Sequence, residues 1–278
     1  MTDPTTRREA ASPFGEWASS VDALMSYRYL ASRPRAIDRS HAEGLMQLRP
    51  DLRTSAGAVL AAPLTIAMLD VAGINVDRIW ILALTQTNVE VLDAAVEVGE
   101  VYLSGHITSE ARSQIFTEAR IYDAADQNRL IGFGTANWSV ICPTPEGFQY
   151  PEPGRGVNET TELLPLWQAY TGRRRTDGLL EIPGLRPEIG GERLHHGPML
   201  VVTEAAAIEA AAKALGTDAL AVEHLGLTIV APGRSGPFVA NPVLVAVRAD
   251  TVGCRIELRD GGRDDRLVAT AFVRLRKG

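Results

Sequence analysis

The stretch RLHHGPMLVVTEAAAIEAAAKALG, residues 193–216, decides the fold prediction. Pro198 suits the first position of a helix, because the N–H that it lacks would have no partner there. Gly216 is a signal for the end of the helix. The segment between them is apolar on nearly every side, which indicates a helix buried all round, and it holds one carboxylate, Glu204, in its first half.

The chain contains an internal repeat. LRPD begins at Leu48 and LRPE at Leu185, while DAADQNRLIG begins at Asp123 and DGGRDDRLVA at Asp260, and both pairs share an offset of 137 residues. The first copy also has a short strand followed by an apolar helix, expected over 58–72 and ended by Gly73. In each copy we expect the first strand to carry the Arg-Pro pair, at 44–52 and at 179–186.

Strand-like segments follow each helix, and hairpin turns join the last two in each copy. One helix followed by antiparallel strands indicates an α+β fold rather than alternating βαβ units. The segments are 79–92, 99–111, 113–124 and 129–141 in the first copy, and 222–231, 236–249, 253–261 and 266–276 in the second.

The repeat divides the chain into four parts. Residues 1–39 form an N-terminal extension with a helix expected over 14–27, and residues 40–142 form the first domain. A linker rich in Pro and Gly, 143–175, contains one short helix expected over 161–170 and leads to the second domain, 176–278.

The composition excludes several classes of protein. A net charge of −6 gives no electrostatic footprint for nucleic acid. The longest apolar stretch, 56–69, is too short to span a membrane, and the N-terminus lacks the apolar core of a signal peptide. The two cysteines, Cys142 and Cys254, have no metal-ligand spacing and form no disulfide framework. We therefore predict a cytoplasmic protein with no metal, no membrane contact and no nucleic-acid partner.

Two carboxylates inside the apolar helices are candidate catalytic groups. A buried carboxylate is costly unless it pairs, takes up a proton or does chemical work, and burial raises its pKa toward that of a general base near neutral pH. Glu204 is the candidate in the second helix and Asp70 in the first. The alternative for Glu204 is a structural one, in which it caps a helix or pairs with a buried arginine such as Arg186 or Arg234.

The HHGP sequence stands where the second helix begins. Backbone N–H groups are free at a helix start and polarise a carbonyl oxygen or hold an oxyanion. Gly197 lets a substrate approach the backbone closely, and His195 or His196 can orient or protonate it. The alternative is that these histidines only cap and pack the helix.

A long central helix wrapped by an antiparallel sheet, twice in one chain, resembles a tandem, or double, hotdog protein. The HHG start with Glu204 nine residues after His195 is similar to the hotdog acyl-CoA thioesterases. In that family a His-Gly-Gly turn opens the helix and an acid nine residues further on is catalytic, which implies these roles for His195, Gly197 and Glu204. The resemblance covers about residues 40–142 and 176–278.

The first copy departs from that pattern. At the constant offset Ala58 matches His195 and Ala67 matches Glu204, while Asp70 lies three residues beyond Ala67. Three residues are nearly one helical turn, so we expect Asp70 to lie on the same helix face as Ala67 and to point into the same cleft. The first copy is therefore either a degenerate half that builds the interface, or the source of the acid while the second copy supplies the helix start.

The resemblance implies an active site at the seam between the two copies, and hydrolysis of an acyl thioester there. Thr87 and Asn88 are then expected to face the substrate, and Arg234 to meet a phosphate of coenzyme A, which enters as part of the substrate and not as a cofactor. Two alternatives stay open: a hydratase or dehydratase acting on an enoyl-CoA, and a non-catalytic acyl-CoA-binding protein. The family also implies a homo-oligomer.

Overall fold

The computed structural model describes residues 24–77, 79–144 and 163–278, and it contains one sheet of twelve strands. The strand order is β1-β2-β4-β5-β6-β3-β9-β12-β11-β10-β8-β7, and every pair is antiparallel. The N-terminal extension supplies β1 (Arg35–Ala36). The first copy supplies β2 (His41–Gln47), β3 (Trp80–Val91), β4 (Glu100–Glu110), β5 (Gln114–Asp123) and β6 (Leu130–Pro143). The remainder supplies β7 (Arg173–Arg174), β8 (Leu180–Ile182), β9 (Leu220–Ile229), β10 (Phe238–Val247), β11 (Thr251–Asp260) and β12 (Arg266–Lys277).

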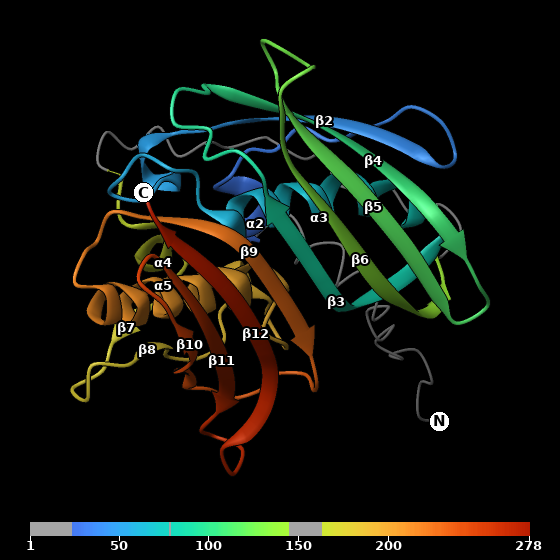
Figure 1. Cartoon of the computed structure of the whole chain (residues 1–278). Coiled ribbons are helices and arrows are strands. Elements are labelled where there is room, and N and C mark those ends of the chain that lie inside the picture. The colour runs from blue at the N-terminus through green and yellow to red at the C-terminus, as the bar shows by residue number, and fades with distance from the viewer. Residues whose placement is uncertain (1–23, 78, 145–162) are drawn as a thin grey trace, which may run out of the picture.

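Each half of the sheet curves around one long helix (Figure 1). The first half packs on α3 (Ala61–Asp77) and the second on α5 (His196–Leu215), and the two helices also contact each other. The halves join where β3 pairs with β9, from Gln86↔Thr228 to Glu90↔His224. The α+β architecture predicted from the repeat is therefore present, with one continuous sheet across both copies.

The offset of 137 residues holds in three dimensions. It relates β5 to β11 at both ends, and it relates two short 3-10 helices, η1 (Pro50–Leu52) and η2 (Pro187–Ile189). The predicted first strands were too long at this point, because the Arg-Pro pairs lie outside them. Proline has no N–H to give to a ladder and suits the first position of a helical turn, so the strands end before it.

The two central helices differ from the prediction at their ends. Helix α5 ends as predicted, with Gly216 in the left-handed conformation (φ 66°), but it begins at His196, so Pro198 stands at the third helical position and not at the first. The N–H of the third position also has no partner inside the helix, so proline is tolerated there. Helix α3 begins three residues later than expected, at Ala61, and continues through Gly73 to Asp77. A glycine inside a helix costs only about 1 kcal/mol relative to alanine, and the burial of residues 71–76 outweighs that cost.

Short helices from outside the two repeats complete the core. Helix α2 (Met25–Arg28) and helix α4 (Leu166–Ala169) both contact α5. Helix α4 falls within the short linker helix that was predicted over 161–170. Most of the helix predicted over 14–27 lies outside the described residues. Over the described ranges, no helix is both long enough and apolar enough to cross a membrane.

Candidate active site

Glu204 binds the start of the other central helix. Its Oε1 accepts a hydrogen bond from the Ala61 N–H at 2.6 Å, and its Oε2 accepts one from the Ala62 N–H at 3.0 Å. The first N–H groups of a helix have no partner inside the helix and carry a partial positive charge. The carboxylate of the second copy therefore lies on the anion-binding end of α3, and neither arginine considered as its partner pairs with it.

Burial controls the proton affinity of Glu204. The residue is 2% exposed. Loss of solvent raises its pKa to about 7, against the two backbone hydrogen bonds, which lower it. A carboxyl group that titrates near neutral pH is present as base and as acid in comparable amounts, which suits general acid–base chemistry.

The start of helix α5 carries a second, separate cluster. His195 is the N-cap residue, and its Nδ1 accepts a hydrogen bond from the Gly197 N–H at 3.4 Å. The Oγ of Ser26, in α2, lies 3.2 Å from the same Nδ1. The Gly197 N–H and the Ser26 hydroxyl therefore meet at the same ring nitrogen, which ties α2 to the start of α5.

Asp70 lies in the same neighbourhood. It is 4% exposed, and its Oδ2 accepts a hydrogen bond from Ser32 Oγ at 2.5 Å. Tyr170, which directly follows α4, is fully buried, and its pKa is raised well above the usual value by burial and then by the charge of Asp70, while a hydrogen bond with Ser26 opposes the shift. Ser26 and Tyr170 thus connect the acid of the first copy to the helix start of the second.

Burial also keeps the two histidines neutral. It lowers the pKa of His195 to about 4, and it lowers that of His196 well below the usual value, with the adjacent His195 as a further cause. The rings lie 3.8 Å apart between centroids. Nε2 of His196 is buried and has no hydrogen-bond partner in the described part of the chain.

The other predicted site residues lie elsewhere. Thr87 and Asn88 are neighbours on β3, so their side chains point to opposite faces of the sheet. Thr87 is buried and donates to the Thr135 carbonyl, whereas Asn88 lines a depression on the outer face. Arg234 is exposed in the loop before β10, where its backbone N–H donates to Asp260.

Sequence reasoning did not identify the partners of the two acids. The amides of Ala61 and Ala62 escaped it because α3 was placed three residues too early. The other partners, Ser26, Ser32 and Tyr170, lie outside the predicted bounds of the two copies, 40–142 and 176–278. No periodic pattern there indicated contact with the core. Among the described residues there is no group of three or more His, Cys, Asp or Glu side chains able to hold a metal ion.

Replacing Gly197 with alanine should lower the melting temperature by several degrees. An added Cβ would overlap Ser26 Oγ, so Ser26 and with it α2 would have to move. Thermal unfolding of the single variant and of Gly197→Ala combined with Ser26→Ala tests the contact. The second change removes the clashing hydroxyl, so the double variant should recover most of the loss, and equal melting temperatures for the two variants would contradict this packing.

The chain matches no known protein-family model and no curated protein sequence. It does match solved structures over most of its length. A protein with a hot dog fold from Alicyclobacillus acidocaldarius is similar with a TM-score of 0.62 at 10% identity, covering 88% of this chain and 95% of that one. A tesB protein from Mycobacterium avium subs paratuberculosis has a TM-score of 0.60 at 14% identity, with coverage of 94% and 99%.

An acyl-CoA thioesterase II, TesB2, from Mycobacterium marinum is also similar, with a TM-score of 0.58 at 10% identity over 88% of this chain and 95% of that one. The chain therefore has the hot dog fold, as its resemblance to hotdog proteins implied. Its structural neighbours thus include one protein named as tesB and one named as an acyl-CoA thioesterase II.

Proposed function

We propose that this protein hydrolyses acyl thioesters, with an acyl-CoA as the substrate class and Glu204 as the catalytic base or nucleophile. The contact between the Glu204 carboxylate and the two amides at the start of α3 carries the proposal. A carboxyl group already occupies the place that the oxyanion of a tetrahedral intermediate would need, with N–H donors at 2.6 and 3.0 Å, close to the distances of an oxyanion hole. The names of the structural neighbours support the same reaction class.

In the reaction, the thioester carbonyl oxygen replaces a Glu204 oxygen at the amides of Ala61 and Ala62. The released carboxylate takes a proton from water as the water oxygen bonds to the carbonyl carbon. The C–S bond then breaks, the fatty or other acid is released, and the proton passes to the departing thiolate. In the nucleophilic variant a Glu204 oxygen attacks the carbonyl carbon and the C–S bond breaks, which gives an anhydride and a thiolate. Water then cleaves the anhydride into the free acid and the Glu204 carboxylate, and the proton released passes to the thiolate.

The cluster at the start of α5 favours a second candidate, hydration of an enoyl thioester. The sequence showed no aspartate close to the histidines, but the fold brings Asp70 of the first copy to the group formed by Ser26, Tyr170 and His195. A carboxylate and a neutral imidazole are the acid–base pair that adding water to a double bond requires. A non-catalytic acyl-CoA-binding protein is the third reading.

A substrate panel separates these readings. Thiol release is measured with acyl-CoAs of increasing chain length and with an aromatic acyl-CoA, and loss of the enoyl absorbance is measured with a 2-enoyl-CoA. We expect thiol release from at least one saturated acyl-CoA. Hydration without thiol release would move the assignment to the cluster at α5, and saturable binding without either reaction would leave only the binding role.

A further inference from the structure

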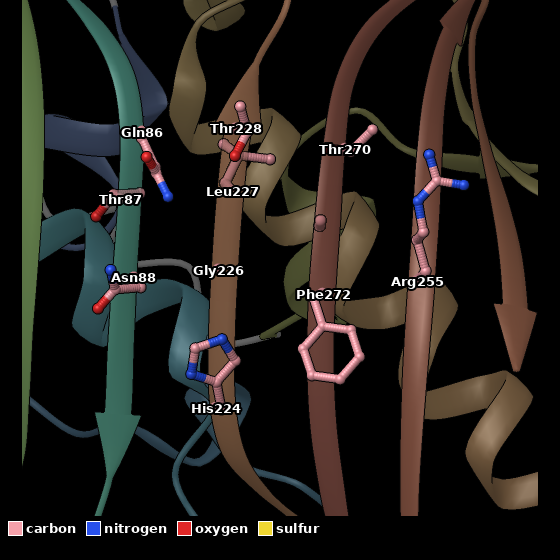
Figure 2. A pocket seen from close by; sticks show the side chains of 11 residues that line it. Gln86, Thr87, Asn88, His224, Gly226, Leu227, Thr228, Arg255, Thr270 and Phe272 are labelled. Atoms are coloured by element: carbon pink, nitrogen blue, oxygen red, sulfur yellow. The ribbon is translucent and has the colours of Figure 1, made fainter. Parts of the chain in front are cut away.

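A depression on the outer face of the sheet lies over the seam between the two copies (Figure 2). Its volume is about 270 Å³. The helices lie behind the strands in this view, so the sheet separates the depression from α3 and α5. Glu204 belongs to α5 and binds the start of α3, so it lies on the far side of the sheet from the depression. The lining side chains come from four adjacent strands: Gln86 and Asn88 of β3, His224 and Thr228 of β9, Thr270 and Phe272 of β12, and Arg255 of β11.

Gly226 forms the floor of this depression, and its backbone conformation in β9 does not require glycine. It pairs with Asn88 on one side and Phe272 on the other, in the interior of an extended strand. The nearest atom to an added Cβ would be Nε2 of the His224 side chain, at 3.1 Å, so the ring would have to shift by a few tenths of an ångström. Glycine inside a strand weakens it and often marks a place where a ligand approaches the backbone.

The lining offers hydrogen-bonding groups that the protein leaves unused. Within the described chain, the side chains of Gln86, Thr228 and Thr270 form no hydrogen bond. Asn88 donates to Thr135 Oγ1 through its amide nitrogen, which leaves its Oδ1 as an acceptor. Amides and hydroxyls therefore surround the bare backbone of Gly226.

An aromatic face and a cation flank these neutral groups. Phe272 is 40% exposed and stands beside the floor. Arg255 binds Glu257 through one guanidinium nitrogen at 2.6 Å and is 46% exposed in its side chain, so other N–H groups remain available. The His224 ring is held by Glu90, its cross-strand neighbour on β3, because Nδ1 lies 2.7 Å from Glu90 Oε1.

From this arrangement we infer that the depression binds an adenine nucleotide. Aromatic side chains stack on nucleobases, and asparagine or glutamine amides hydrogen-bond the edge of adenine. The base would lie on Gly226 beside Phe272 with its edge toward Gln86 and Asn88. A phosphate attached to the ribose would meet Arg255, because guanidinium groups pair with phosphate oxygens.

Nucleotide binding is measured by titrating the full-length protein with AMP, using isothermal calorimetry and ligand-observed NMR. Ribose 5-phosphate and coenzyme A are titrated in parallel. AMP should bind saturably and at least tenfold more tightly than ribose 5-phosphate. Coenzyme A carries the same adenosine with additional phosphates, so coenzyme A binding that is tighter than AMP binding and is weakened by Gly226→Val would identify coenzyme A as the source. Absence of AMP binding, or equal binding of ribose 5-phosphate, would overturn the inference.

The variant Gly226→Val fills the floor without touching the proposed thioesterase site. A β-branched side chain suits an exposed face of a strand, so the melting temperature should stay the same or rise. AMP binding should weaken at least tenfold. Binding that survives in the folded Gly226→Val protein would contradict the site.

A second pair of variants keeps the test independent of that substitution. Phe272→Ala removes the stacking face and should weaken AMP binding by about tenfold. Phe116→Ala is the matched control, because Phe116 is a similarly exposed phenylalanine, at 39%, on β5 outside the depression. Equal affinities of the two variants for AMP would exclude stacking on Phe272. Thiol release is a separate readout, so a failed thioesterase assay leaves this result unaffected.

Discussion

Replacing Glu204 with glutamine should reduce thiol release from acyl-CoA by about 100-fold or more, the usual contribution of a positioned general base or acid. Glutamine keeps the size of the side chain but cannot accept a proton from water or attack the carbonyl. Its amide oxygen still accepts one hydrogen bond from the start of α3, so the helix keeps part of its cap. The measurement is kcat and KM for the best acyl-CoA of the panel, with the fold monitored by circular dichroism.

Two further variants decide what a loss of activity means. Glu209→Gln is the matched control, since Glu209 lies on the same helix but forms an exposed pair with Arg174. It should leave kcat unchanged. Asp70→Asn tests the second cluster, and a loss of thiol release confined to this variant would place the acid in the first copy. Full activity in Glu204→Gln together with a lower melting temperature would show that Glu204 only caps α3.

The fold could be predicted because its signals are local and repeated. Buried helices of this kind are recognised from an apolar pattern bounded by Pro198 and Gly216. Successive hairpins account for the runs β4-β5-β6 and β10-β11-β12, whereas β3 and β9 pair with strands that do not follow them directly in the chain. The offset of 137 residues linked two weak patterns into one architecture. The pairing of β3 with β9 is different, since it joins two strands with no turn between them, and only the fold-family resemblance pointed to a seam there.

The site was predicted only in part, because its contacts are between distant segments. The sequence marked Glu204 as a carboxylate in an apolar setting, but it could not show that the carboxylate meets the start of the opposite helix. Helix α3 begins three residues later than predicted, so the N–H groups without a partner inside the helix are those of Ala61 and Ala62 and not those near residue 58. The connection of Ser26 to His195 spans 169 residues and depends on a short helix outside both copies.

The pH dependence of stability should differ in sign between Glu204 and His195. A carboxyl group whose pKa rises to about 7 from its ordinary value of 4.5 binds a proton more readily in the folded state. Folding therefore gains from acidification between pH 7 and 4.5, by about 3 kcal/mol at most. A buried histidine whose pKa falls from 6.5 to about 4 behaves in the opposite way, because only the unfolded chain takes up the proton between those values.

Chemical unfolding of three proteins across pH 4 to 8 measures both effects. Relative to the wild type, Glu204→Gln should lose stability as the pH falls from 7 to 4.5, because it lacks the group that gains a proton on folding. His195→Asn should gain relative stability from pH 6.5 downward, since asparagine keeps an N-cap acceptor for Gly197 but has no proton to exclude. His196 remains in this variant, and because its pKa is also lowered by burial, the variant still loses some stability on acidification. Parallel curves for all three proteins would mean that Glu204 and His195 are solvated in the folded state, and a solvated Glu204 would lose the near-neutral pKa that suits it to act as a base.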